Sequence, residues 1–240
     1  MTARFEPIGL AELERRAALM RRVDRKYLLD REQLDELLER APRDCRVLQI
    51  DGRTRFRYRS TYYDSPELAS YRAAALGRRR RWKVRTRDYL DTGSSFLEVK
   101  TRATRQSDKH RIPAERLDER GRGFVREVLT EAGIEAAGAE LLVPTLVTDY
   151  RRTTLLDPAG TTRLTIDTDL AWRAGELRLD RRQLVVVETK TAGAPTQLDQ
   201  LLWRCGHRPQ RISKYATGLA ALAPDLPRTR WSRTLRRHFC

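Results

Sequence analysis

Apolar and polar residues alternate along several stretches of this chain. This alternation predicts β-strands, because successive side chains of a strand point to opposite faces. The predicted strands cover residues 22–30, 46–50, 53–64, 82–89, 96–102, 142–156, 162–172 and 176–190, the last with a turn near 180–182. Apolar residues at helical spacing predict helices over 10–20, 31–41, 67–76, 118–133, 196–206 and 213–223.

Capping residues support three of these helices. Asp30 and Asp118 stand where N-caps are expected, and Ser65 with Pro66 provides an N-cap and a first-turn proline for the helix at 67–76. About eight strands with few helices between them predict an α+β fold: a mainly antiparallel sheet that curls towards a β-barrel, with peripheral helices. We expect one domain over 1–226 and a basic C-terminal tail over 227–240, either a mobile arm or a docking helix.

Cations occupy one face of several predicted strands. Lys83, Arg85 and Arg87 stand in one row, where neighbours about 6 to 7 Å apart would repel by about 2.5 kcal/mol. For any single row, a solvated sheet face is the simpler interpretation. Taken together, the rows favour the lining of a barrel that holds an anion, because like charges on neighbouring strands destabilise a sheet.

The overall charge agrees with an anionic ligand. The formal net charge of +16 over 240 residues suggests nucleic acid, an anionic membrane surface or phosphorylated molecules as partners. Only 7% of the residues are aromatic, which makes nucleic acid the less favoured of these. There is no GxxxxGK[ST] loop, no apolar run long enough for a membrane span and no signal-peptide pattern, so we expect a cytoplasmic protein.

Isolated carboxylates accompany the cations. Glu188, Glu98 and Asp167 are candidate ligands for Mg²⁺ or Mn²⁺, ions that bridge phosphate oxygens in phosphoryl transfer. For Glu98 and Asp167, a salt bridge to a neighbouring cation is an equally good interpretation.

Eight motifs, in order, resemble the VTC (vacuolar transporter chaperone) domain of polyphosphate polymerases, within the triphosphate tunnel metalloenzyme or CYTH-like superfamily. They are DRKYLL at 24–29, RSTYYDSPELASYR at 59–72, WKVRTRDY at 82–89, FLEVK at 96–100, DYRRT at 149–153, RLTIDTDL at 163–170, VVVETK at 185–190 and RISKYATG at 211–218. The resemblance implies an antiparallel barrel around a basic tunnel.

The same resemblance implies roles for individual residues. Glu188 matches the metal-binding glutamate, and Lys26 and Lys214 match lysines that bind the phosphate chain. The remaining implied phosphate ligands are Arg85, Arg87, Lys100 and Arg163, with Arg59, Lys83, Lys190 and Arg211 as further substrate-binding residues.

By this resemblance, the chain is a metal-dependent polymerase that transfers the γ-phosphate of ATP to inorganic polyphosphate, with a membrane protein as a candidate partner. Hydrolytic members of the superfamily often begin with ExExK, whereas this chain has Arg22, Asp24 and Lys26. Loss of the first carboxylate fits a polymerase or a degenerate binder better than a hydrolase. A tripolyphosphatase or nucleoside triphosphatase of the same fold, a non-catalytic polyphosphate sensor, a membrane-surface domain and a nucleic-acid binder remain as alternatives.

Overall fold

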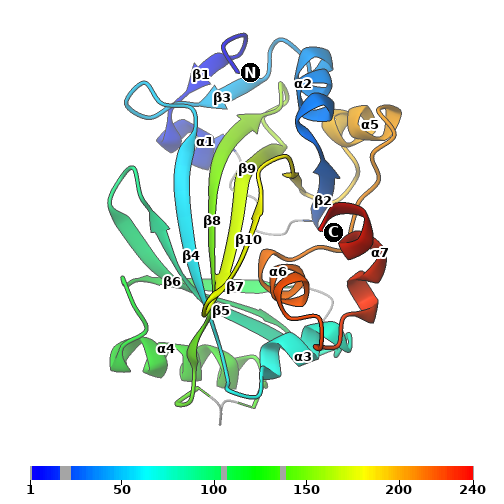
Figure 1. Ribbon diagram of the computed structural model, residues 1–240. Helices are drawn as coiled ribbons and strands as arrows, with labels where there is room; N and C mark the ends of the chain where they lie inside the picture. Colours follow the sequence, from blue (N-terminus) through cyan, green and yellow to red (C-terminus); the bar gives the residue numbers. More distant parts are fainter. Residues whose placement is uncertain (1, 17–22, 104–106, 136–138, 240) are drawn as a thin grey trace. The chain divides into compact units, whose positions relative to one another are not determined.

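The computed structural model describes residues 2–16, 23–103, 107–135 and 139–239 (Figure 1). Arg22 and the end of the first predicted helix lie outside these ranges. The strands are β1 (Glu6–Ile8), β2 (Val23–Leu29), β3 (Arg46–Leu48), β4 (Phe56–Asp64), β5 (Arg81–Tyr89), β6 (Ser94–Arg102), β7 (Asp108–Pro113), β8 (Val143–Leu156), β9 (Arg163–Ala174), β10 (Leu177–Arg181) and β11 (Val185–Thr191). The helices are α1 (Leu10–Arg16), α2 (Arg31–Arg40), α3 (Ala69–Ala75), α4 (Glu119–Glu131), α5 (Gln197–Arg204), α6 (Lys214–Leu222), the 3₁₀-helix η1 (Thr229–Trp231) and α7 (Ser232–His238).

The strands hydrogen-bond in the order β2-β11-β9-β8-β4-β5-β6-β7, and β1, β3 and β10 pair with members of this series. Pairing is antiparallel between β2 and β11, β11 and β9, β4 and β5, β5 and β6, and β6 and β7, whereas β1 and β3 pair in parallel. The predicted class, an α+β fold with a mainly antiparallel sheet and peripheral helices, is therefore confirmed. Among the described residues, no helix is long and apolar enough to cross a membrane.

The chain divides into two compact units. Unit 1 comprises residues 1–57, 150–170 and 181–211, and unit 2 comprises 58–149, 171–180 and 212–240. In unit 1, α2 and α5 cover one face of β2, β9 and β11, with Leu34, Leu202 and Val187 in the shared core. In unit 2, α4 covers one face of β5 and β6, with Val125 and Leu97 in the core. Each unit therefore buries one apolar sheet face and leaves the opposite face for polar residues.

Two of the three predicted caps are confirmed. The Asp30 carboxylate accepts a hydrogen bond from the Gln33 amide, and the Gln33 side chain accepts one from the Asp30 amide, which completes a capping box at α2. The Asp118 carboxylate accepts from the Gly121 amide at the start of α4.

The predicted start of the helix after Ser65 was wrong, because α3 begins at Ala69. The carboxylate of the preceding strand residue, Asp64, accepts hydrogen bonds from the amides of Ser70 and Tyr71 at 2.9 Å each. It thus caps α3 from a position outside the turn that the sequence pattern identified.

The sequence pattern also misplaced some strand limits. Strand β4 begins at Phe56 rather than at residue 53, and β7 (Asp108–Pro113) lies where no strand was predicted. The segment DKHRIP of β7 lacks the alternation of apolar and polar residues that reveals the other strands.

The basic tail takes the docking-helix form of the two alternatives. Trp231, Leu235 and Phe239 are buried in unit 2. The Trp231 ring lies 5.9 Å from the Tyr71 ring, and the Phe239 ring lies 5.4 Å from the Trp172 ring, between centroids. The segment beyond residue 226 is therefore packed onto unit 2.

A close contact fixes α6 within unit 2. A Cβ atom on Gly218 would lie 2.3 Å from both Cδ1 and Nε1 of Trp172, a side chain that is 1% exposed. The Trp172 Nε1 group also donates a hydrogen bond of 2.9 Å to the Lys214 carbonyl. The glycine of the RISKYATG motif is thus required by the indole that packs against it.

Gly218→Ala is expected to lower the free energy of unfolding by about 1 to 3 kcal/mol, because neither Trp172 nor the helix backbone can move away freely. Urea unfolding measures the effect. Gly123→Ala in α4 is the matched control, because a Cβ there meets no atom within 4 Å; it should stabilise by about 0.5 to 1 kcal/mol. Equal effects of the two substitutions would contradict the packing argument.

Candidate functional site

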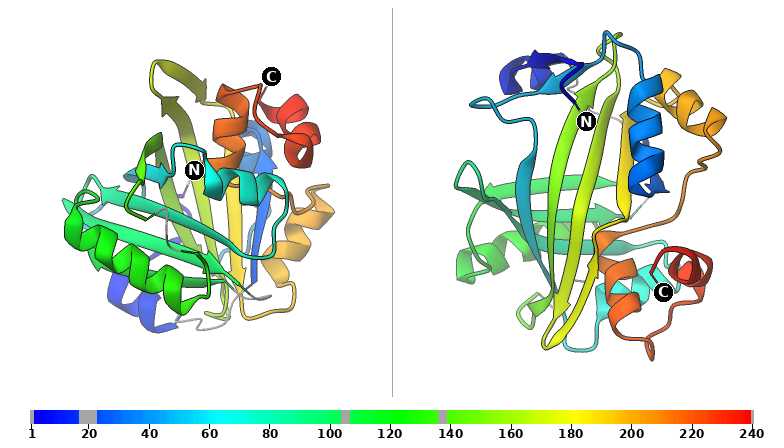
Figure 2. Two further views of the ribbon diagram at one scale, coloured as in Figure 1. Left: turned by 90° about the horizontal axis from the view of Figure 1, so that it is seen from below. Right: turned by 45° about the horizontal axis from the view of Figure 1, so that its top comes forward.

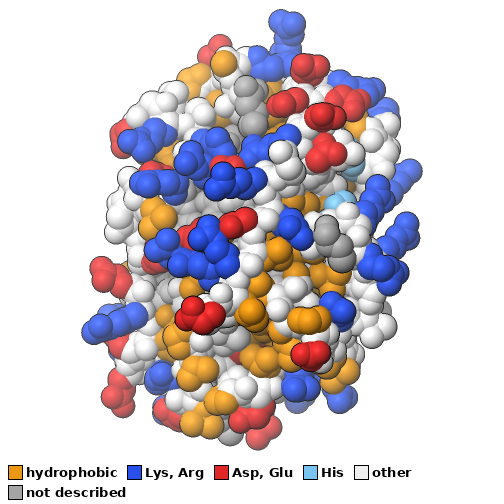
Figure 3. Space-filling view, in the orientation of Figure 1, with side chains coloured by type: hydrophobic (Ala, Val, Ile, Leu, Met, Phe, Trp, Pro, Cys, Tyr) orange, Lys and Arg blue, Asp and Glu red, His pale blue; other side chains and the backbone are white. Residues whose placement is uncertain are grey.

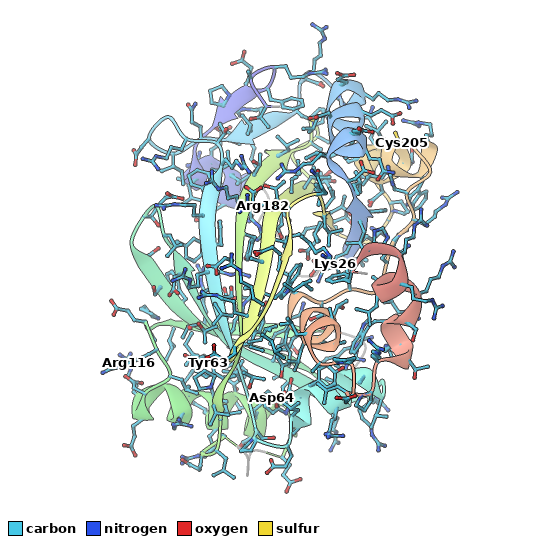
Figure 4. All side chains as sticks on the ribbon, in the orientation of Figure 1. Lys26, Tyr63, Asp64, Arg116, Arg182 and Cys205 are labelled. Carbon is cyan, nitrogen blue, oxygen red and sulfur yellow. The ribbon has the colours of Figure 1, made fainter. Side chains whose placement is uncertain are left out.

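One face of unit 1 carries charged residues from three neighbouring strands. Glu188 on β11 lies opposite Lys26 on β2 and Thr165 on β9. Lys190 lies opposite Asp24 and Arg163 in the same registers. Directly opposed residues of antiparallel strands project to the same side, so the unit 1 charged face consists of these positions. We include Asp167, which alternates with Thr165 and Arg163 along β9. Figure 4 labels Lys26 on β2.

Glu188 and Lys190 form an ion pair on this face. The Lys190 Nζ atom lies 3.2 Å from Glu188 Oε2 and donates a hydrogen bond of 3.1 Å to the Thr165 hydroxyl. Both side chains are largely buried, at 12% and 13% exposure. Burial lowers the pKa of Lys190 to about 8, because Glu188 only partly compensates and Arg152 adds a repulsive charge.

Asp167 is neutralised by a cation that was not among the predicted site residues. Its two carboxylate oxygens accept hydrogen bonds of 2.6 and 2.8 Å from Nε and Nη2 of Arg152. Asp167 is fully buried. This arrangement is the salt-bridge alternative, and it occupies both oxygens of a candidate metal ligand.

Arg163 sits at the edge of the same face. Its Nη2 atom donates a hydrogen bond of 3.3 Å to the carbonyl of Leu13 in α1.

The polar face of unit 2 is dominated by cations. Arg85 lies opposite Glu98, and Lys83 lies opposite Lys100, which in turn lies opposite Lys109. Arg87 alternates with Arg85 and Lys83 along β5, so the predicted row of three shares one face. We call Lys83, Arg85, Arg87, Glu98, Lys100 and Lys109 the unit 2 cationic face.

Glu98 is the carboxylate at the centre of this face. Arg85 donates to Oε2 from Nε at 2.8 Å and from Nη2 at 2.6 Å, and Lys109 donates to Oε1 at 2.5 Å. Arg87 Nη1 lies 3.8 Å from Oε2. Burial alone would raise the pKa of Glu98, but the three cations outweigh it and hold that pKa well below its usual range. The salt-bridge alternative therefore describes Glu98 as well.

Arg85 and Arg87 are held by aromatic rings in addition to Glu98. The Arg85 guanidinium lies 5.7 Å from the Tyr62 ring centroid and donates to the Tyr62 hydroxyl at 3.0 Å. The Arg87 guanidinium lies 5.8 Å from the Tyr58 ring centroid, and this side chain is almost buried. Among the described atoms, the buried Nε of Arg87 has no hydrogen-bond acceptor. Glu98 thus contacts three cations, of which Arg87 is buried, and the unit 2 cationic face contains more cations than carboxylates.

Lys109 is a member of this face that the sequence did not reveal. Burial, together with Arg85 and Arg87, lowers its pKa to about 8 although Glu98 acts in the opposite direction. It lies on β7, the strand that the sequence pattern missed.

The shifted pKa of Lys109 predicts a pH dependence of stability. The unfolded chain keeps this proton up to about pH 10.4, whereas the folded chain releases it near pH 8. Unfolding therefore takes up a proton between these values, and the contribution of Lys109 to the free energy of unfolding rises with pH across this window. Urea unfolding at several pH values should show a shallower rise for Lys109→Met than for the unchanged chain. Identical slopes would show that the pKa of Lys109 is not lowered.

The other predicted substrate-binding residues are placed differently. Arg59 lies opposite Asp88 on the α4 side of the sheet and donates to Asp149 at 2.7 Å, so the register separates it from Arg85. Lys83 Nζ contacts the Ser213 hydroxyl at 3.5 Å. Lys214 is the first residue of α6, and Arg211 is exposed in unit 1 just before it.

No group of three or more acidic, histidine or cysteine side chains gathers for a metal ion within the described ranges. Glu188 and Asp24 are the other carboxylates of the unit 1 charged face. Mg²⁺ is commonly bound by one or two carboxylates when phosphate oxygens supply its other ligands. The residues present therefore fit an ion that arrives with a phosphate substrate.

The VTC domain model matches residues 21–223. This chain belongs to the VTC domain family. Every residue of both faces lies within the matched range, whereas η1 and α7 follow it. No curated protein is significantly similar to this VTC domain chain in sequence.

Solved structures share the fold of this VTC domain. A candidate adenylate cyclase from Bacillus halodurans aligns with a TM-score of 0.53 at 11% identity, over 82% of this chain and 96% of that one. A candidate adenylyl cyclase from Hippeastrum, described with a dominant triphosphatase activity, aligns with a TM-score of 0.51 at 15% identity, over 83% and 95%. The expected membership of the VTC domain family is confirmed, and these two structures share its fold.

Proposed function

We propose that this VTC domain protein is a metal-dependent polyphosphate polymerase that transfers the γ-phosphate of ATP to a growing polyphosphate chain. The observation that carries the proposal is the unit 2 cationic face, where Glu98 is shared by Arg85, Arg87 and Lys109. Arg87 is buried and the other two cations are partly exposed, so several positive charges share one carboxylate and favour a bound anion. A chain of phosphates supplies that charge at every unit along its length.

Each face is proposed to bind phosphate by itself. In unit 2, Arg85, Arg87 and Lys100 would bind phosphates of the substrate, which arginine forks contact in bidentate fashion. In unit 1, Arg163 would bind phosphate in the same way. Lys26 and Lys214 would bind further phosphates of the chain. Lys83, Lys190 and Arg211 are additional cations for the same substrate, while Arg59 would contact phosphate only outside the row of Arg85.

Glu188 would hold a Mg²⁺ or Mn²⁺ ion together with phosphate oxygens, and this ion supplies charge neutralisation and alignment of the phosphates. Transfer to a phosphate acceptor needs in-line positioning and charge stabilisation rather than a base, because the acceptor oxygen already carries negative charge. Two carboxylates of these faces are already engaged by cations. Asp167 is bound by Arg152, and Glu98 is bound by Arg85 and Lys109. Neither of these two is available to activate water.

The direct test is incubation of the purified protein with ATP and Mn²⁺, followed by a gel stained for polyphosphate. A ladder of phosphate chains is expected. Absence of polymer with either Mn²⁺ or Mg²⁺ would overturn the proposal.

A triphosphatase is the second candidate function. The same cationic faces would bind tripolyphosphate with water as acceptor, and the Hippeastrum protein of this fold is described with a triphosphatase activity. Release of inorganic phosphate from tripolyphosphate without any polymer would favour this function over the polymerase.

A further inference from the structure

Unit 2 carries a second concentration of cations, outside both faces. These side chains come from α3 and the turn after it, and from the C-terminal segment with η1 and α7. We call them the arginine patch: Arg72, Arg78, Arg79, Arg80, Arg228, Arg230, Arg233, Arg236 and Arg237. All nine are exposed. Figure 3 shows Lys and Arg side chains along the right-hand edge, where Figure 1 places α7.

Specific contacts bring the two segments together. The Tyr71 hydroxyl of α3 donates a hydrogen bond of 3.0 Å to the Pro227 carbonyl, and its ring packs on Trp231. Gly77, with φ of +70°, ends the turn after α3, and the Arg230 guanidinium lies directly against it, so that any Cβ at Gly77 would overlap Arg230. Both views of Figure 2 show α3 close to the C-terminal helices. The patch is therefore built by packing of the tail onto α3.

The cations of the patch lack acidic partners. None of the nine arginines forms an ion pair with an acidic side chain among the residues that the structure describes. On α7, Arg233, Arg236 and Arg237 stand three and four residues apart, which places like charges side by side. Such an arrangement gains from a bound polyanion.

The chemistry of the patch selects among polyanions. The patch contains arginine and no lysine, and the planar guanidinium matches two oxygens of one phosphate. Its aromatic residues, Tyr71 and Trp231, are buried, so no platform is offered for stacking nucleic-acid bases. The apolar residues of α7 are turned into unit 2, and a single exposed leucine, Leu76, borders the patch, so it lacks an apolar face that could enter a bilayer.

We propose that the arginine patch is an accessory binding surface for long linear polyphosphate. The role that we assign to the patch rests on the proposed function. The patch would bind the part of a polyphosphate chain that extends beyond the phosphates bound by the charged faces. The proposal gives η1 and α7, which follow the residues matched by the family model, a role in binding polyphosphate.

The test compares two charge-matched triple variants. Arg233→Gln, Arg236→Gln and Arg237→Gln together remove three charges from the patch. Arg43→Gln, Arg116→Gln and Arg120→Gln remove three exposed arginines from other segments, which likewise form no ion pair within the described part of the chain. Unchanged melting temperatures show that both variants fold.

Binding of end-labelled long-chain polyphosphate and of inorganic triphosphate is measured at fixed salt. The patch variant should bind the long chain about tenfold more weakly and triphosphate with unchanged affinity, and the control variant should bind both as before. Equal weakening in the two variants, or no weakening in the patch variant, would overturn the inference.

Two further binding measurements test whether the patch binds a membrane or a nucleic acid instead. If loss of the three arginines reduces binding to phosphatidylserine vesicles or to single-stranded DNA but leaves long-chain polyphosphate binding intact, the surface serves a membrane or nucleic acid and the inference fails. The polymerase assay is independent of these measurements. Arginine-dependent binding of the long chain without any product ladder would reject the proposed function and leave the binding surface.

Discussion

Glu188→Gln is expected to abolish synthesis of polyphosphate from ATP, with a loss of at least about 100-fold. The substitution keeps the shape of the side chain but removes the charge that would hold a divalent ion against the phosphates. Product formation in the presence of Mn²⁺, followed on stained gels and by release of ADP, measures the effect. Ladders of equal yield from the variant would remove Glu188 from the mechanism.

The same variant separates binding from catalysis. Glu188 is the ion-pair partner of Lys190, so its replacement leaves the unit 1 charged face with more positive charge. Affinity for triphosphate without metal should therefore be maintained or increased while synthesis is lost. Glu36→Gln is the matched control, because Glu36 is an exposed residue of α2 in the same unit and forms its ion pair with Arg40. It should leave both properties unchanged.

Asp64→Ala is expected to lower the free energy of unfolding by about 3 to 5 kcal/mol, the largest stability effect that we predict. Asp64 is fully buried at the end of β4, where Figure 4 labels it. Its carboxylate accepts hydrogen bonds from the amides of Ser65, Ser70 and Tyr71 and from the Tyr215 hydroxyl at 2.5 Å. Alanine would leave all four donors without this acceptor inside unit 2.

Urea unfolding measures this loss, and Asp225→Ala is the control because Asp225 is an exposed aspartate of the same unit. The control should change stability by less than about 0.5 kcal/mol. A loss for Asp64→Ala no larger than the control's would show that other groups satisfy these donors. Asp199 has a comparable place in unit 1, where it accepts from the hydroxyls of Tyr27 and Thr189.

Local patterns predicted most of the secondary structure, because alternation and capping act over a few residues. The capping box at Asp30 and the cap at Asp118 are examples, since each involves partners within one helical turn. The shared face of Lys83, Arg85 and Arg87 also followed from alternation alone.

Contacts that join distant residues could not be predicted in this way. Asp64 binds Tyr215, which is 151 positions away, so this role leaves no local pattern. Its capping of α3 spans six and seven residues, more than the three that separate the partners in the Asp30 and Asp118 caps. Lys109 was missed because its strand lacks apolar alternation. The family resemblance implied Arg59 as a further substrate-binding residue, and only the register shows that it lies opposite Asp88, on the side of α4 and away from Arg85.

For Glu98 and Asp167, the sequence could define two roles but could not choose between them. A carboxylate among cations has the same sequence pattern whether it binds a metal or an arginine. The choice depends on side-chain geometry, and the forks of Arg85 and Arg152 provide it.

The packing of Trp231 and Phe239 onto Tyr71 and Trp172 shows how far the folded part of this chain extends. The family match ends at residue 223, yet three buried apolar side chains of unit 2, Trp231, Leu235 and Phe239, come from residues after that point. The packed structure therefore continues beyond the segment that the family model matches. A fragment that ended at residue 223 would need other apolar cover for Tyr71 and Trp172.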